Sequence, residues 1–190
     1  MKNRKAPRPA RTVHPTEDIL RHWREAVPDD RLAHLVKDAT RALVRALQMR
    51  LNEQGVSFGH WTFLRVLWEH DGLTQRSLSA QAGVMEPTTF AALNAMEKLG
   101  YIERRQMGGN RKKNHVFLTA RGRSLKRKLV PLAEEVNRVA VARLKAADVA
   151  LTRRVLLAMI ENLARDEEKP ANRERRVPAT RELARRLTSR

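Results

Sequence analysis

The sequence predicts a mainly α-helical protein with a small β-hairpin. Along most of the chain, apolar residues recur at the period of an amphipathic helix. After Gly100 the period shortens to about two residues, and two alternating runs flank a glycine-rich tip, which is typical of a hairpin. The 190 residues include no cysteine, which excludes disulfides and thiolate metal clusters.

Positive charge is concentrated in three stretches. The formal net charge is +18, with +5 in residues 1–12, +9 in residues 100–130 and +6 in residues 169–190, while the rest of the chain is close to neutral. Such concentration indicates nucleic acid or another anionic surface as partner. No apolar run approaches the roughly 18 residues of a membrane span, and the basic N-terminus lacks the apolar core of a secretory signal. We therefore expect a cytoplasmic protein without a membrane partner.

The two ends of the chain are rich in Pro, Arg and Lys and poor in large apolar residues. This composition predicts a disordered basic tail over residues 1–15 and a second basic tail over residues 169–190. Thr16, followed by two acidic residues, is expected to begin a short amphipathic helix over residues 16–27.

The main domain is predicted over residues 28–168, and it begins with two helices. The first, over residues 30–54, has apolar residues at i, i+3, i+4 and i+7 and ends at Gly55. The second starts near Ser57 and stops at Asp71.

Two short helices follow, and the turn between them contains Gly83. The first covers residues 74–82 with Thr74 as N-cap; the second begins around Glu86 and ends at Gly100. Such a pair forms a helix-turn-helix, whose second helix presents its N-terminal turn to the bases of the DNA major groove. The alternative is that two short helices merely pack a core.

The runs 101–105 and 115–119 are expected to pair as a hairpin directly after these helices, which makes a winged helix-turn-helix over about residues 57–119. Arg111 at its tip is expected to reach the minor groove, with Lys112 and Lys113 on phosphates. Small residues on the second short helix indicate limited base readout and a larger share for phosphate contacts and DNA shape. The candidate DNA contacts are Gln75, Arg76, Pro87, Thr88, Thr89, Asn94, Arg111, Lys112 and Lys113.

After the hairpin, Thr119 is expected to cap a long helix, in which Pro131 predicts a kink or a break near residue 130. A last helix is expected from about Leu151. The helices over 30–54 and 120–165 are more apolar than a lone winged lobe needs, so we expect them to form a homodimer interface.

Residues 30–165 resemble the MarR family of bacterial winged-helix regulators. The resemblance rests on LTQRSLSAQAGVMEPTTFAALNAMEKLGYIERR followed by NRKKNHVFLTARG, which matches the family's wing pattern D-R-R-x-x-x-V-x-L-T-x-x-G. It implies a homodimer that binds a pseudo-palindromic operator and is usually a repressor released by a small, often aromatic or phenolic, ligand. Two positions depart from the family: Asn110 replaces the Asp that braces the wing, and Ser77 replaces a Glu, which removes a capping-box partner of Thr74.

The resemblance also implies a ligand pocket between the dimerisation helices and the DNA-binding lobe. Aromatic walls, a hydrogen bond and cations for an anionic ligand would come from Arg41, Arg45, Phe58, His60, Trp61 and Arg65. Plain core packing is the alternative for the aromatic residues. The histidines lack metal-ligand spacing, and no phosphate loop, nucleophile elbow or HExxH is present, so we expect no enzyme, no metal and no cofactor.

The sequence thus predicts a sequence-specific DNA-binding transcriptional regulator, a homodimeric repressor that is nucleoid-associated when bound to DNA. Two alternatives stay open: a weakly specific DNA-architectural protein of the same fold, and a ligand- or partner-binding module whose wing contacts an acidic protein.

Overall fold

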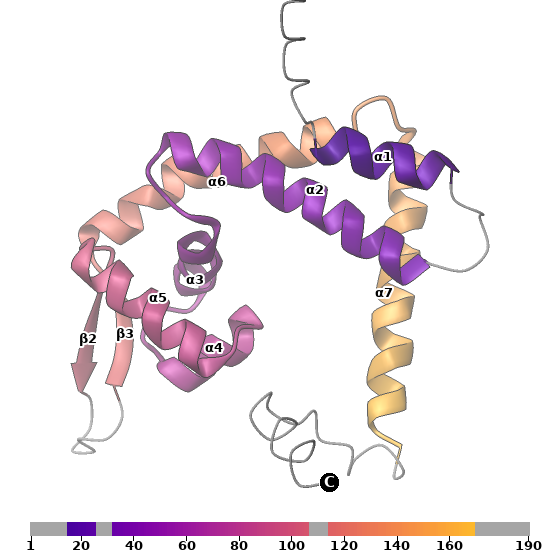
Figure 1. The fold of residues 1–190 in the computed structure, drawn as a ribbon. Helices are drawn as coiled ribbons and strands as arrows, with labels where there is room; N and C mark the ends of the chain where they lie inside the picture. The colour runs from indigo at the N-terminus through magenta and orange to yellow at the C-terminus, as the bar shows by residue number, and fades with distance from the viewer. Residues whose placement is uncertain (1–14, 26–31, 107–113, 170–190) are drawn as a thin grey trace, which may run out of the picture. The chain divides into compact units, whose positions relative to one another are not determined.

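The computed structural model describes residues 15–25, 32–106 and 114–169 (Figure 1). These residues fall into two compact units that divide between Ala140 and Val141. The elements, in chain order, are α1 (Pro15–Glu25), α2 (Leu32–Glu53), α3 (Phe58–Glu69), β1 (Leu73–Thr74), α4 (Gln75–Ala82), α5 (Glu86–Lys98), β2 (Ile102–Gln106), β3 (Asn114–Leu118), α6 (Ala120–Ala140) and α7 (Ala146–Glu167). The mainly helical fold class with a small antiparallel sheet is confirmed.

The hydrophobic core of the first unit surrounds α3. Phe63, Leu64 and Leu67 of this helix are almost completely buried, and they pack in one cluster with Leu78 of α4 and Leu93 of α5. The core therefore fixes the helix-turn-helix on α3.

Helices α2 and α6 pack against each other, and an ion pair joins them. Arg50 of α2 donates from Nε and from one terminal nitrogen to Oε1 of Glu135 on α6, at 3.1 and 2.9 Å. These hydrogen bonds hold the pKa of Glu135 below its ordinary value.

The helix-turn-helix forms where the sequence predicts it. The Thr74 hydroxyl caps α4 by accepting from the Ser77 amide at 3.1 Å, and it also donates to the Ser77 hydroxyl at 2.9 Å. The side chain of Ser77 therefore still bonds the cap, although the expected Glu is absent. Gly83 ends α4 in the left-handed region at φ 65°, which glycine adopts without the steric cost that a Cβ would add.

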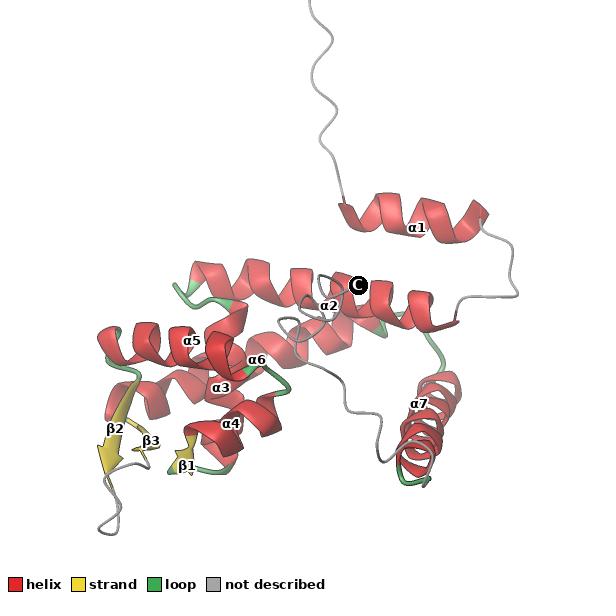
Figure 2. Cartoon of the chain, turned by 60° about the horizontal axis from the view of Figure 1, so that its bottom comes forward, coloured by secondary structure: helices red, strands yellow, loops and turns green. Residues whose placement is uncertain are grey.

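The sheet has the strand order β1-β3-β2, and both pairs are antiparallel. In the hairpin, Ile102 pairs with Leu118 and Gln106 pairs with Asn114, one residue away from the predicted bounds at each strand. Figure 2 shows β2 and β3 next to α5. The sequence did not predict β1, which is only two residues long and exists through its pairing with β3.

Helix α6 is continuous through Pro131, so the prediction of a break near residue 130 is wrong. Proline removes one backbone hydrogen bond, and the burial of Leu129 and Val136 holds the helix on both sides of it. The long helix ends at Ala140, and α7 begins at Ala146, five residues before the expected start.

Several sequence predictions lie outside the described residues. These are the tails over 1–14 and 170–190, the ends of the first two predicted helices within 26–31, and the wing tip. Within the described ranges, no helix has the length and apolarity needed to cross a membrane.

Candidate nucleic-acid interface

The N-terminal half of α5 is exposed on the face opposite the core. Pro87 and Thr88 are exposed, and so are two larger apolar side chains, Met85 at 62% and Phe90 at 51% of their possible surface. A helix-turn-helix uses this end of its second helix to reach base edges.

Thr89 does not belong to this surface, so its predicted contact with DNA is wrong. Its side chain has 0% exposure, and its hydroxyl lies 3.0 Å from Ser79 Oγ and 3.1 Å from the Met85 carbonyl oxygen. The Ser79 hydroxyl in turn donates to the carbonyl of Val84. Thr89 therefore ties α5 to the end of α4 across the turn.

Asn94, which the sequence analysis named as a candidate DNA contact, is half-buried. Its side-chain oxygen accepts from Arg104 of β2 at 2.6 Å. The Arg104 amide donates to Glu97 at 3.2 Å, and the guanidinium carbon of Arg104 lies 5.6 Å from the centre of the Phe90 ring. Arg104, which sequence reasoning missed, therefore joins the wing strand to three side chains of α5.

Gln75 and Arg76 form the start of α4. Gln75 is half-buried, whereas the Arg76 side chain is 90% exposed and its Nε lies 4.0 Å from the carboxylate of Glu86. The exposed cation of Arg76 is thus next to the first residue of α5, as a phosphate contact beside the major groove requires.

The wing strands carry further cations up to the point where the tip begins. The Arg105 guanidinium lies 5.1 Å from the centre of the Phe117 ring and bonds to Glu103. The last strand pair joins Gln106 to Asn114. The cations Arg111, Lys112 and Lys113 lie in the loop outside the described residues, so their DNA contacts stay predictions, as does the effect of Asn110.

Asp71 anchors the wing to α3 and α6. Its Oδ1 accepts from the amides of Leu118 at 2.8 Å and Gly72 at 3.1 Å, and its Oδ2 accepts from Arg123 at 2.9 Å. The hydroxyl of Thr119 accepts from the Gly122 amide at 3.1 Å, which confirms it as the cap of α6.

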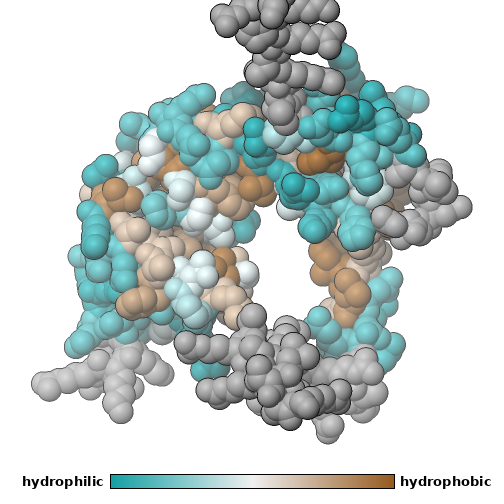
Figure 3. Space-filling model, viewed as in Figure 1, coloured by the Kyte–Doolittle hydropathy of each residue, from teal (hydrophilic) through white to brown (hydrophobic). Residues whose placement is uncertain are grey.

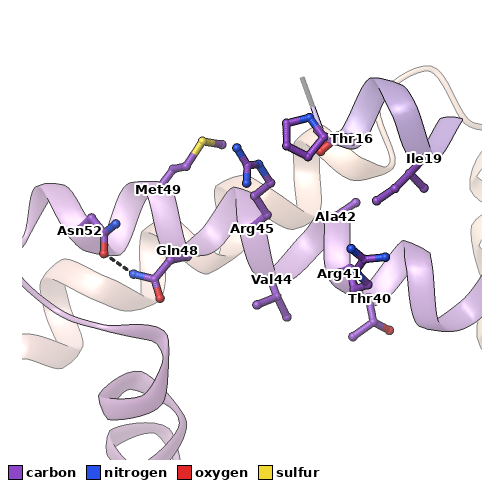
Figure 4. A pocket seen from close by; sticks show the side chains of 11 residues that line it. Thr16, Ile19, Thr40, Arg41, Ala42, Val44, Arg45, Gln48, Met49 and Asn52 are labelled. Carbon is purple, nitrogen blue, oxygen red and sulfur yellow. Dashed lines mark hydrogen bonds between the residues drawn. The ribbon is translucent and has the colours of Figure 1, made fainter. Parts of the chain in front are cut away.

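The predicted ligand residues are divided between different places. Phe58, Trp61 and Arg65 line a cavity of about 450 Å³ whose other walls come from α2, α4 and α6. Arg41 and Arg45 line a separate pocket of about 620 Å³ between α1 and α2. Figure 4 shows this pocket, with Thr16 and Ile19 of α1 next to the two arginines.

His60 lines neither of these two pockets. Its ring packs edge-on against Tyr101 at 6.3 Å between centres. Burial lowers the pKa of His60, so the neutral imidazole is favoured in the folded protein. His60 therefore does not share a pocket with Phe58 and Trp61, the aromatic residues with which the sequence analysis grouped it.

Helix α7 has no buried residue, and its exposed side chains include several leucines, one valine and one isoleucine. Figure 3 shows hydrophobic patches on its surface between hydrophilic ones. In the described parts of the chain, no group of three or more His, Asp or Glu side chains is placed to hold a metal ion.

The helix-turn-helix, its exposed α5 and the adjoining hairpin define a winged-helix DNA-binding fold. The model of the MarR family matches residues 56–113, which begin just before α3 and end in the wing loop. The HTH-type transcriptional regulator TtmR of Methylorubrum extorquens is 28% identical over 109 residues, which are 57% of this chain and 56% of the relative, so this chain spans just over half of that protein.

Solved structures of transcriptional regulators share this fold. The transcriptional regulator PA3341 is 29% identical with a TM-score of 0.63, and the match covers 70% of this chain and 98% of that one. A MarR family transcriptional regulator from Listeria monocytogenes, complexed with 26mer DNA, is 24% identical with a TM-score of 0.64, covering 72% and 91%. The chain is therefore similar in sequence and fold to MarR-type transcriptional regulators, and its fold is that of their winged-helix DNA-binding lobe.

Proposed function

We propose that this protein is a sequence-specific repressor that binds a pseudo-palindromic operator as a homodimer and is released by a small aromatic acid. The observation that carries the DNA-binding part is the exposure of the N-terminal half of α5 between Arg76 and the wing strands. In this proposal Pro87 and Thr88 enter the major groove, while Gln75 and Arg76 contact the backbone. The wing cations follow the minor groove and its phosphates.

The apolar surface of α7 supports the homodimer. Leu151, Val155 and Ile160 are exposed, and a helix with this composition buries its apolar side against a partner in a stable protein. A second copy of α7 supplies a matching surface. Two-fold symmetry then places two α5 helices about 34 Å apart, on successive turns of DNA.

The cavity lined by Phe58, Trp61 and Arg65 supports the effector site. Its volume of about 450 Å³ lies within the roughly 300–1,000 Å³ of small-molecule pockets. The two aromatic rings suit a flat apolar ligand, and the Arg65 guanidinium suits a carboxylate. Arg41 and Arg45 form a second candidate place for an anionic ligand.

Selection from a random duplex library with the full chain tests the DNA-binding part. The recovered duplex and a scrambled duplex are then titrated at the same salt concentration, where we expect a difference in Kd of at least about 10³-fold. A difference within about tenfold would favour the architectural alternative, which the apolar face of α5 also fits. Light scattering on the free protein checks the dimer.

Benzoate and 4-hydroxybenzoate are suitable probes for the effector part. We expect them to quench the fluorescence of Trp61 and to release the selected duplex. Arg65→Gln should weaken both effects if the acids bind in the cavity beside Trp61. A loss of both effects in Arg41→Gln instead would assign the acids to the pocket between α1 and α2. If the parent keeps its DNA affinity in saturating amounts of both acids, release by aromatic acids is rejected.

A further inference from the structure

We propose that α5 reads thymine methyl groups in the major groove, with Met85, Phe90 and Ala91 as specificity-determining residues. This inference rests on the proposed DNA-binding function and specifies the base chemistry that the helix recognises. It follows from which side chains are exposed on α5 and from which polar groups are already engaged.

The exposed face of α5 is apolar where it would meet the bases. Residues three and four apart are neighbours on a helix surface, so Pro87, Phe90 and Ala91 form one exposed patch. Met85 precedes the helix as its N-cap residue and is exposed at 62%. Isolated apolar side chains on a surface need no explanation, but these lie together at the end of the helix that faces base edges.

The first two turns of α5 expose two polar side chains, those of Glu86 and Thr88. The hydroxyl of Thr89 is buried against Ser79, and the carboxylate of Glu86 lies near Arg76. Thr88 is the one uncharged hydrogen-bonding side chain that these turns expose. On the third turn, Asn94 already accepts a hydrogen bond from Arg104. Helix α5 therefore offers few side chains that could read a base by paired hydrogen bonds.

The Phe90 ring is held in a defined position. The guanidinium of Arg104 lies over it at 5.6 Å, and the same guanidinium bonds Asn94 on the next turn. Because the Arg104 side chain is only 16% exposed, it is fixed by these contacts. Arg104 is thus a positioning residue for Phe90.

The major-groove edges of the four base pairs differ in what an apolar side chain can accept. Thymine presents a C5 methyl group, which Phe and Ala contact favourably. Both A·T and G·C pairs also present polar groups in this groove, so the preference of an apolar side chain comes from the methyl group. The patch therefore favours A·T pairs over G·C pairs at the positions that it covers. The competing reading is that Glu86 accepts from cytosine, in which case methyl groups would not matter.

Replacing thymine by deoxyuridine tests the inference, because uracil keeps every hydrogen bond and lacks only the methyl group. The probe is the duplex recovered by selection with the full chain, synthesised with thymine or with uracil in both half-sites. Each methyl group that the protein buries contributes about fourfold to affinity, so one methyl per half-site should raise Kd by about 15-fold in the uracil duplex. Phe90→Ala should reduce this ratio by about fourfold or more. Leu99→Ala, an exposed apolar residue at the other end of α5, should keep it.

The outcomes separate this inference from the proposed function. If selection recovers no preferred sequence, sequence-specific binding fails and the inference fails with it. If it recovers a preferred sequence and the two duplexes bind within twofold of each other, the thymine-methyl inference alone is overturned. It is also overturned if Phe90→Ala keeps the full ratio. Circular dichroism of Phe90→Ala confirms that the variant is folded, as expected for an exposed side chain.

Discussion

Replacing Thr89 by valine separates a structural role from a DNA-reading role at this position. Valine has nearly the same shape as threonine and lacks only the hydroxyl. The substitution therefore removes the contacts of Thr89 with Ser79 and with the Met85 carbonyl oxygen and leaves the packing in place. The Met85 oxygen keeps its bond from the backbone amide of residue 89 at 2.9 Å, and Ser79 still donates to Val84.

The variant therefore loses one buried hydrogen bond, and the acceptor of that bond keeps another partner. This loss should lower the free energy of unfolding by about 1–2 kcal/mol. For a chain of this size each kcal/mol lowers Tm by about 2–4 °C. Thermal unfolding should show this drop when parent and variant are measured at one protein concentration, because association makes Tm depend on concentration. At 20 °C, where the variant stays folded, its Kd for the selected duplex should equal that of the parent.

Thr88→Val is the matched control, since Thr88 is exposed at the preceding position. Its unfolding free energy should stay within about 0.5 kcal/mol of the parent, while its DNA affinity falls. The reasoning is refuted if Thr89→Val weakens DNA binding without lowering Tm. That result would return Thr89 to the DNA-contacting set.

Two further substitutions test how the lobe is held together. Gly122→Ala places a Cβ only 2.0 Å from the backbone oxygen of Tyr101, so it should destabilise the protein by about 3 kcal/mol or more in denaturant titrations. Gly59→Ala is the control. The nearest atom to its new Cβ is a side-chain oxygen at 3.8 Å, so this variant should be neutral or stabilising in the same titrations. Glu135→Gln should lower Tm near neutral pH, because the hydrogen bonds from Arg50 keep the pKa of Glu135 below its ordinary value and so stabilise the folded state above that range. The difference from the parent should close as the pH falls through the lowered pKa, and a constant difference down to pH 2 would contradict the assignment.

Local signals made most of the fold predictable. Thr74 and Gly83 mark the ends of α4 by the chemistry of a cap and of a left-handed residue, and both act within a few residues of sequence. The change of period after Gly100 likewise located the hairpin to within one residue. The strand β1 could not be found in this way, because two residues have no period and become a strand only through β3.

The candidate site was less predictable because side-chain direction depends on the tertiary structure. Asn94 was a candidate DNA contact by residue type, but its side chain bonds Arg104, ten residues away on the wing strand. For Thr89 a signal was present: it precedes Leu93 and Met96 by four and seven residues, which is the spacing of one buried helix face. The hydroxyl of Thr89 favoured a DNA contact, whereas the helix period placed Thr89 on the buried face. The structure agrees with the helix period.

The α4–α5 turn links the proposed effector site to the helix that would read DNA. Ala82, the last residue of α4, lines the same cavity as Trp61 and Arg65. The turn begins at the next residue, and the bonds among Thr89, Ser79 and Val84 fasten it to α5. A ligand that displaces Ala82 should therefore move α5 or break these bonds, since closely packed protein interiors leave little room to absorb the shift. Under this coupling, Thr89→Val should need a higher benzoate concentration than the parent for half-release of the selected duplex. The reason is that the variant lacks the Thr89–Ser79 hydrogen bond, so a displacement of the turn moves α5 less. Equal release curves would show that the cavity acts on DNA binding by another route.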